Sequence, residues 1–230
     1  MVKRPIFYDT ETTGIRASED RIIELAAFDP TRGTTFDQLI DPECPIPPEA
    51  SAIHKITDSM VAGKPTFQKV AAEFATFCEG EVVLIAHNND GFDRHFLRAE
   101  YTRAGHPEPP WEHFDTLKWA RRYRPDLPRH SLQFLRATYG FEENNAHRAL
   151  DDVIVLHQIY CALVDDLTIE EALSLLGASK AITKMPFGKY RGTPLKDIPS
   201  DYIAYLKREG AFDKPGNEEL RESLTALGVL

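Results

Sequence analysis

Apolar and polar residues along the first forty positions fall into three short runs, each with the composition of a β-strand. The runs cover residues 5–10, 21–29 and 34–41, and only short polar links separate them. Links of this length join neighbouring antiparallel strands, so the pattern predicts a meander. A proline-rich segment at 42–48 ends it.

Beyond residue 47 the apolar spacing changes to that of helices. Helices are expected over residues 47–53, 67–78, 90–104, 115–123, 131–139 and 149–164. The expected N-cap residues are Thr57, Thr66, Asp115 and Ser131. The continuous apolar run 82–86 predicts a strand buried on both faces, and 111–114 a shorter one. This order indicates an α/β fold with a mixed sheet flanked by helices.

The composition changes near Asp165, which indicates a second, smaller domain. We expect a first domain over residues 1–166 and a small appended domain over 178–230. Further helices are expected at 169–176, 200–207 and 218–227, and a β-hairpin at 185–192.

Composition narrows the class of protein. Apolar residues are 42% and charged residues 27% of the chain, which excludes disorder throughout. The longest apolar run has six residues, too short for a membrane span of roughly 18. No apolar stretch follows Lys3 and Arg4, so no export signal is expected. Three widely separated cysteines indicate a reducing compartment, the cytoplasm.

The net charge of −9 argues against a protein that coats nucleic acid by bulk charge. It is compatible with a nuclease that has a local basic track, and with a site whose carboxylates hold divalent cations.

Asp9 and Glu11 stand two residues apart at the end of the first expected strand, so their side chains share one face of it. Two carboxylates side by side repel each other, and burying them is costly unless a cation lies between them. Thr10, Thr12, Thr13 and Gly14 add hydroxyls and a flexible turn that suit a phosphate and sugar. Taken alone, these residues also fit a surface pair followed by a plain polar turn.

A second polar segment, residues 87–93, follows the buried strand 82–86. Its last residue, Asp93, lies where a strand gives way to a helix, and open α/β sheets bind ligands at such strand ends. Asp90 and Asp93 could each cap the helix instead. Phe92 beside Asp93 is an expected core anchor.

The third segment begins the helix 149–164. Steps of three, four, seven and eleven residues from Asp152 reach only apolar positions, whereas the same steps from Asp151 reach a mixed set. Asp152 is therefore expected to head the buried stripe, with Asp151 nearer solvent. His147 lies five residues earlier and is expected in the preceding loop, where a general base could reach a water molecule. An exposed loop histidine is the simpler alternative. Carboxylate oxygens without cysteine select hard cations, Mg²⁺ or Mn²⁺.

These three segments resemble the motifs of the DEDDh proofreading-type 3′→5′ exonucleases, which have an RNase H-like fold. The resemblance covers about residues 4–165 and is carried by the runs 9–14, 87–93 and 147–152. One departure is the length of the second motif, which makes Asp90 a rival of Asp93; the pair Phe92-Asp93 fits the family better. Residues 187–192 also resemble the tail of bacterial exodeoxyribonuclease X.

The resemblance implies that Asp9, Glu11, Asp93 and Asp152 bind two divalent ions, Mg²⁺ or Mn²⁺, and that His147 is the general base. It implies removal of nucleoside 5′-monophosphates from the 3′ end of DNA, in DNA repair. Residues 52–57 resemble the family's segment that helps hold the terminal nucleotide. The expected substrate-binding residues are Thr10, Thr12, Thr13, Gly14, His54, Ile56, Asn88 and Phe92.

The expected partner is single-stranded DNA or a duplex 3′ end. Two locally basic stretches, 118–136 and 180–208, contain interleaved aromatic residues, as single-strand tracks do. The alternative for both is solubilising charge around packed rings. Alternative functions are an RNA 3′-end trimmer and a polymerase-associated proofreading or binding subunit. The superfamily includes homodimers, but no feature of this sequence requires one.

Overall fold

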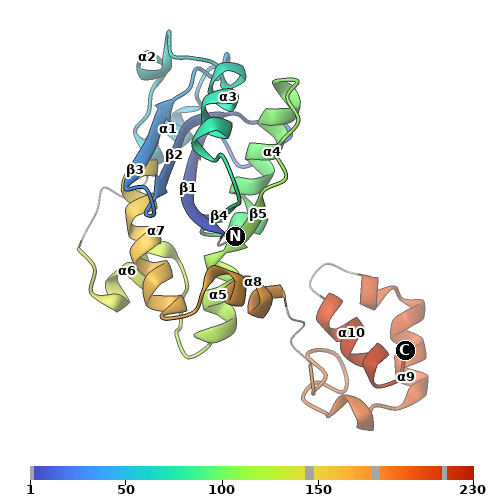
Figure 1. Cartoon of the computed structure of the whole chain (residues 1–230). Helices are drawn as coiled ribbons and strands as arrows, with labels where there is room; N and C mark the ends of the chain where they lie inside the picture. The colour runs from blue at the N-terminus through green and yellow to red at the C-terminus, as the bar shows by residue number, and fades with distance from the viewer. Residues whose placement is uncertain (1–2, 143–147, 178–181, 214–216) are drawn as a thin grey trace. The chain divides into compact units, whose positions relative to one another are not determined.

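The computed structural model describes residues 3–142, 148–177, 182–213 and 217–230 (Figure 1). The chain forms two compact units, Met1–Leu173 and Ser174–Leu230. In the described part of the chain, no helix is both long and apolar enough to cross a bilayer.

The first unit is built on a five-stranded sheet with the strand order β3-β2-β1-β4-β5. The strands are β1 (Arg4–Thr12), β2 (Ile22–Asp29), β3 (Thr34–Leu39), β4 (Val82–Ala86) and β5 (Glu112–Asp115). The first three pair antiparallel, as the short links predicted, while β4 and β5 run parallel to β1. The predicted mixed sheet is confirmed, with β1 at its centre.

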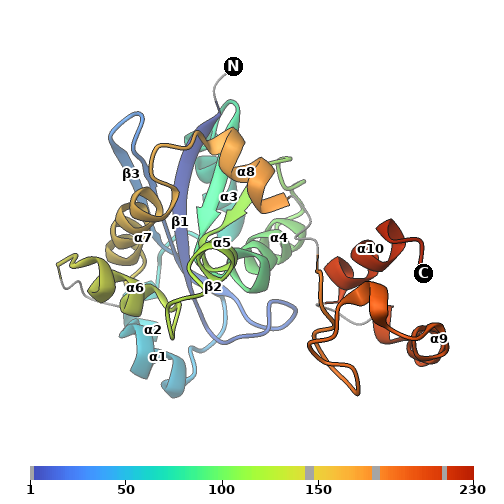
Figure 2. The same cartoon turned by 90° about the horizontal axis from the view of Figure 1, so that it is seen from below.

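Helices cover both faces of this sheet (Figure 2). On one face lie α3 (Phe67–Phe77) and α4 (Asp93–Arg103), and on the other α7 (Ala149–Val164). Two shorter helices, α5 (Thr116–Tyr123) and α6 (Leu132–Tyr139), contribute Ala120 and Leu135 to a small core with α7. The helices α1 (Pro48–His54) and α2 (Asp58–Val61) follow the meander.

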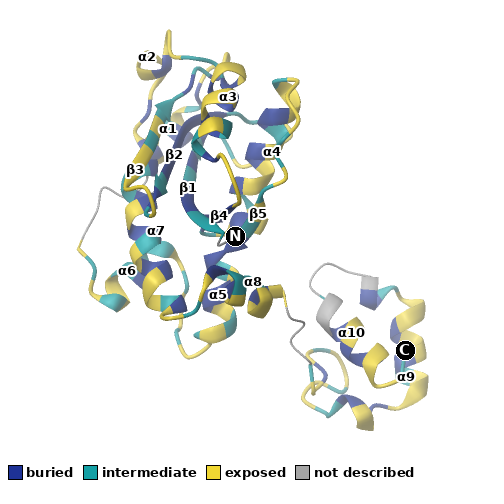
Figure 3. Cartoon of the chain, in the orientation of Figure 1, coloured by how far each residue is buried: buried dark blue, intermediate teal, exposed yellow. Residues whose placement is uncertain are grey.

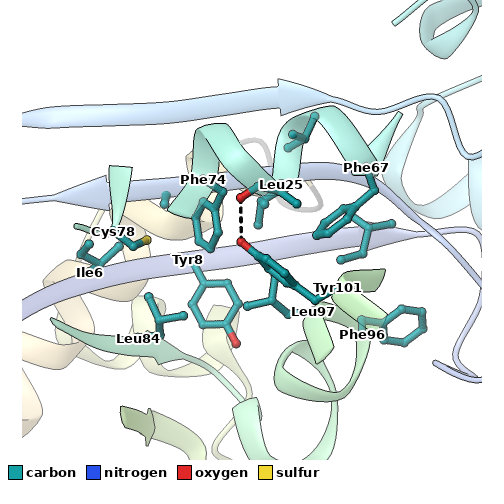
Figure 4. Packing of buried hydrophobic residues seen from close by; sticks show 14 of the residues in the cluster. Ile6, Tyr8, Leu25, Phe67, Phe74, Cys78, Leu84, Phe96, Leu97 and Tyr101 are labelled. Atoms are coloured by element: carbon teal, nitrogen blue, oxygen red, sulfur yellow. Dashed lines mark hydrogen bonds between the residues drawn. The ribbon is translucent and has the colours of Figure 1, made fainter. Parts of the chain in front are cut away.

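Alternation along β1 decides which side chains face which helix. Ile6 and Tyr8 are fully buried against α3 and α4, where Phe74 and Tyr101 pack (Figure 4). The Tyr101 hydroxyl donates to the carbonyl of Ala71 over 2.8 Å, so this core leaves that buried hydroxyl satisfied. Phe7 points to the other face, where its ring meets Tyr160 of α7 at 5.2 Å.

Two local expectations differ from the structure. The predicted helix 90–104 is divided: a 3₁₀ turn, η1 (Asn89–Gly91), precedes α4, and Phe92 between them has φ −143° and ψ −81°. Thr57, Thr66 and Ser131 occupy N-cap positions but make no side-chain cap hydrogen bond. Asp115 does cap α5, accepting from the backbone N–H groups of Leu117 and Lys118.

The second unit has its own apolar core, formed in part by α9 (Ser200–Arg208) and α10 (Glu218–Ala226) (Figure 3). The boundary between the two units falls within the helix α8 (Ile169–Gly177). The 3₁₀ turns η2 (Leu195–Asp197) and η3 (Ala211–Asp213) flank α9. Its buried side chains include Met185, Leu195, Ile203, Leu206, Leu220 and Leu224.

The predicted hairpin at 185–192 is wrong as a pair of strands. The chain does reverse there, held by hydrogen bonds from Met185 N to Thr193 O and from Gly192 N to Met185 O, both 2.8 Å. Only one antiparallel bridge forms, between Lys184 and Pro194. Glycines with φ of +73° and +84°, at 188 and 192, curl the segment, and Pro194 has no N–H to extend a ladder.

Candidate active site

The face of β1 that carries Phe7 also carries Asp9 and Glu11, because alternate residues of a strand share a face. Both carboxylates therefore lie on the α7 side of the sheet. The first turn of α7 brings Asp152 to the same place. One oxygen from each of the three carboxylates lies within 4.8 Å of the others. Asp152 is buried and Asp151 is half-buried, which confirms the side predicted for each.

Asp93 lies beside this carboxylate triple, at the first turn of α4, and is buried. Its Oδ1 accepts hydrogen bonds from the Thr10 hydroxyl at 2.8 Å and from the Thr10 backbone N–H at 3.2 Å. Asp90 is exposed and faces Arg94 and Lys118, at 3.8 and 3.6 Å. The preference for Asp93 over Asp90 as the inward residue is confirmed.

A hollow of about 430 Å³ opens over these acids. It is lined by Asp9, Thr10, Glu11, His87, Asn88, Phe92, Asp93, Ser131, Leu132, Gln133 and Asp152. Asn88 and Phe92, expected at the site, are therefore in place. His87 is held by the Thr116 hydroxyl and by the carbonyl of His130, and burial lowers its pKa.

Burial and mutual repulsion act on the acids together. Burial, and after it the charges of Glu24 and Asp152, raises the pKa of Glu11 to about 8. The pKa of Asp9 is raised well above its ordinary value, because its carboxyl is removed from water and faces Asp93 and Glu11. Burial raises the pKa of Asp93 to about 7, although the hydrogen bonds from Thr10 oppose this. Such acids ionise together only at a large free-energy cost, which a bound cation would offset.

The donor set fits hard divalent cations. Three converging carboxylates offer only oxygen atoms, and the fourth acid adjoins them; no cysteine or histidine belongs to the triple. The half-buried placement of Asp9 and Glu11 leaves them facing the hollow, where a ligand could also reach an ion.

A second hollow, of about 470 Å³, lies on the other side of Phe92 and Glu11, which line both. Thr12, Thr13, Gly14 and His54 line it, as expected for a substrate site. His54 is buried, and its Nδ1 accepts from the backbone N–H of Ile56 at 3.0 Å. Ile56 itself lines neither hollow. Its side chain is fully buried beside Ile23, so it supports the segment from behind and its direct contact with substrate is not supported.

The hydroxyls of the first motif are less available than the sequence suggested. The Thr10 hydroxyl donates a hydrogen bond to Asp93, and the Thr13 Oγ1 accepts one from the backbone N–H of Arg21 at 3.0 Å. The Thr12 hydroxyl donates to the carbonyl of Gly14. At Gly14 an added Cβ would meet the Asp20 carboxylate at 2.5 Å, so that side chain is what requires glycine there.

Three residues that support the site were not assigned to it from the sequence. The Gln133 side chain, from α6, donates to Asp152 Oδ1 at 3.0 Å and accepts from Arg136 Nε at 2.8 Å. Asp115 accepts hydrogen bonds from the backbone N–H groups of Asn88 and Asp90, at 3.2 and 3.0 Å, besides capping α5. Its capping role was predicted, but its hold on the second motif was not.

Glu24 was also missed. It is buried on β2, opposite Glu11 of β1. Its Oε1 accepts from Arg148 Nη2 at 2.9 Å and its Oε2 from the Ala149 backbone N–H at 3.1 Å. It thus fixes the start of α7 three residues before Asp152. His147, the expected base, lies outside the described residues.

Comparison with known families and proteins gives matches over both units. Residues 6–160 match the family model described as "Exonuclease", and residues 177–223 match one described as "Putative quorum-sensing-regulated virulence factor". The DNA polymerase III subunit epsilon of Treponema pallidum (strain Nichols) is 41% identical over 165 residues, covering 68% of this chain and 74% of that protein. Exodeoxyribonuclease 10 of Escherichia coli (strain K12) is 31% identical over 212 residues, covering 86% and 87%.

Solved exonucleases share the architecture. A structure of exonuclease X in complex with 5′ overhanging duplex DNA superposes with a TM-score of 0.58 at 30% identity, over 75% of this chain and 99% of that one. Exonuclease I of E. coli with a dA16 oligonucleotide gives a TM-score of 0.61 at 22% identity, over 70% and 41%. The mixed sheet flanked by helices is therefore the RNase H-like exonuclease fold, which confirms the predicted fold class.

Proposed function

Because the chain belongs to the exonuclease family, we propose that it hydrolyses DNA from the 3′ end with the help of divalent cations, releasing nucleoside 5′-monophosphates. The observation that carries this is the meeting of Asp9, Glu11 and Asp152 oxygens within 4.8 Å, with Asp93 alongside. Asp9 and Asp152 are 143 positions apart in the sequence, so it is the fold that brings these carboxylates together.

In this proposal Asp9, Glu11, Asp93 and Asp152 hold two ions, Mg²⁺ or Mn²⁺. When bound, such ions would stabilise the entering and leaving oxygens of an in-line displacement at phosphorus. Thr10 orients Asp93, and Gln133 orients Asp152, by the hydrogen bonds described above. His147, which directly precedes Arg148, accepts the proton of the attacking water.

The two hollows give the 3′-terminal nucleotides a place. Phe92 lines both, so its ring is positioned to lie between a scissile phosphate over the acids and the terminal sugar and base on the other side. The second hollow is lined by apolar Ile53 and by His54 and Thr13. Such a surface accepts a nucleotide by shape and stacking without reading a particular base.

We favour DNA over RNA as the substrate. We also favour a free enzyme over a subunit of a polymerase. The similarity to exodeoxyribonuclease 10 runs through both units, whereas the similarity to the polymerase subunit covers about two thirds of the chain. Exonuclease X was solved with duplex DNA and exonuclease I with a single strand. We propose that the enzyme acts on single strands or on duplex 3′ ends, in DNA repair and in the cytoplasm.

The test compares 3′-labelled single-stranded DNA, overhanging duplex DNA and RNA of one sequence, with Mg²⁺, Mn²⁺ or EDTA. We expect metal-dependent release of labelled 5′-mononucleotide from DNA and little from RNA. Asp152→Asn should lower turnover by about 10²–10³-fold or more, the range for losing one preorganised charged group.

Asp151→Asn is the matched control, since it removes the same charge one residue away outside the triple. It should change turnover only a few-fold. Equal losses in the two variants, or hydrolysis that survives EDTA, would contradict the assignment.

A further inference from the structure

The second unit presents a row of aromatic rings flanked by cations that the proposed hydrolysis does not use. Tyr190 and Tyr202 meet edge to face with centroids 4.8 Å apart, and Tyr202 and Tyr205 lie nearly parallel, 6.0 Å apart and 28° between planes. The Lys189 Nζ lies 5.4 Å from the Tyr190 ring centre, and the Arg208 guanidinium 5.7 Å from that of Tyr205. We refer to these five residues, 189, 190, 202, 205 and 208, as the tyrosine row.

The row is a built feature and not a chance grouping. On α9, Tyr202, Tyr205 and Arg208 are three residues apart and so share a stripe, while Ile203 and Leu206 are buried in the core. The Tyr202 hydroxyl accepts from the backbone N–H of Lys189 at 3.2 Å, which ties the loop 185–192 to this helix. Gly188 permits that approach: an added Cβ would come within 2.3 Å of the same hydroxyl.

Exposure and charge are those of a binding surface. Tyr205 is 45% exposed, a high value for a large aromatic side chain with no partner ring on its outer side among the described residues. Residues 178–230 hold nine basic and seven acidic side chains, whereas the whole chain holds 27 and 36. Lys184, Lys189, Arg191 and Lys196 are not in an ion pair with any described residue; Arg208 has Glu209 at 3.8 Å.

We propose that the tyrosine row is a binding site for single-stranded DNA, separate from the carboxylate site. Bases would stack on the outer face of Tyr205, and Lys189, Arg191 and Arg208 would neutralise phosphates. A row of rings with interleaved cations is sequence-tolerant, because every base has a π-face and every nucleotide a phosphate. The inference rests on the proposed function only for its choice of DNA, since binding itself needs no hydrolysis.

The experiment measures binding of a fluorescein-labelled dT oligonucleotide to the full chain in EDTA, where no hydrolysis occurs. Tyr205→Ala should weaken binding about tenfold, the effect of losing one stacked base, and Tyr205→Phe should bind as the unmodified chain does. Arg208→Ala should lower the slope of log affinity against log salt by about one. Lys69→Ala on α3, which removes the same charge from an exposed site in the first unit, is the control and should keep the slope.

Circular dichroism on each variant establishes that α9 remains folded. Unchanged affinity in Tyr205→Ala, or an equal loss in Lys69→Ala, would overturn the proposal. Hydrolysis of the p-nitrophenyl ester of thymidine 5′-monophosphate by the unmodified chain, with Mn²⁺, tests the proposed function separately. If the chain does not hydrolyse this ester but the tyrosine row still binds the dT oligonucleotide, the proposed function is refuted and the binding proposal stands.

Discussion

In the proposed mechanism, protonation and metal binding compete at the carboxyl group of Glu11. Its pKa in the folded chain is about 8, against an ordinary value of 4.5. Between these values the folded chain holds a proton that the unfolded chain has released, so the free energy of unfolding should fall as pH rises from about 5 to 8.

Urea denaturation in EDTA at several pH values measures this dependence. Glu11→Gln, which cannot ionise, should show a weaker dependence, and Mg²⁺ should restore stability at pH 8 by replacing the proton. A pH dependence that is the same in both proteins would mean that Glu11 does not carry the effect.

Single residues were predictable where a local period fixed their direction. The two-residue period of a strand placed Asp9 and Glu11 together, and the apolar stripe of a helix placed Asp152 inward. Gln133 escaped prediction because its hydrogen bond to Asp152 crosses between two helices, 19 positions apart. No local period reports how α6 and α7 are packed. Ile56 was predicted to bind substrate because it lies in the segment 52–57 that resembles the family. The sequence did not show that its side chain is buried.

At the scale of elements, the start of α7 depends on an ion pair between the buried Glu24 of β2 and the partly exposed Arg148. Glu24→Ala would leave the Arg148 guanidinium and the Ala149 N–H without their acceptor. We expect a loss of about 1–3 kcal/mol in the free energy of unfolding, and a fall in turnover because Asp152 lies one turn further along. Urea denaturation and steady-state kinetics measure the two effects.

Glu24→Gln keeps one acceptor and should lose less. A double-mutant cycle with Arg148→Ala should give a coupling energy within the usual 0.5–3 kcal/mol for contacting groups. Strictly additive losses would show that Glu24 and Arg148 do not act together.

Helices and strands were predictable where the apolar spacing was regular. The predictions were wrong where an unusual backbone conformation interrupted the element. The observed bounds of α7 and β4 match the predicted ranges 149–164 and 82–86. Neither the apolar stripe of α7 nor the apolar run of β4 is interrupted. The helix expected at 90–104 is broken at Phe92, since the ring packs on Phe96 at 4.8 Å while the preceding turn is held by Asp115. The predicted hairpin strands do not form because Gly188 and Gly192 have positive φ and Pro194 has no N–H to extend a ladder.

At the scale of the whole molecule, element order predicted the mixed sheet and the short links predicted the antiparallel pairing of β1, β2 and β3, but the neighbours of β4 and β5 were not predicted. Nothing in the local pattern predicts that β1 is the central strand, and this position places Asp9 between β2 and β4. The second unit was expected from composition. Its tyrosine row was expected only in part, because the basic stretch 180–208 predicted interleaved aromatic residues but not that Tyr205 stacks on Tyr202.

Because the two units have separate apolar cores, we expect them to unfold in separate transitions that one substitution can distinguish. Gly188 has φ +73°, and an added Cβ would clash with the Tyr202 hydroxyl, so Gly188→Ala should destabilise the second unit by about 1–3 kcal/mol. Both tryptophans, Trp111 and Trp119, lie in the first unit. Their fluorescence transition should therefore stay in place while an earlier phase appears in far-ultraviolet circular dichroism.

Gly33→Ala is the matched control in the first unit. It has φ +64° with open space around the added Cβ, so only the backbone conformation is strained, by about 1–2 kcal/mol. It should shift the fluorescence transition and leave the phase assigned to the second unit unchanged. A fluorescence shift of equal size in Gly188→Ala would mean that the two cores unfold as one, and the stability of the carboxylate site would then depend on the second unit.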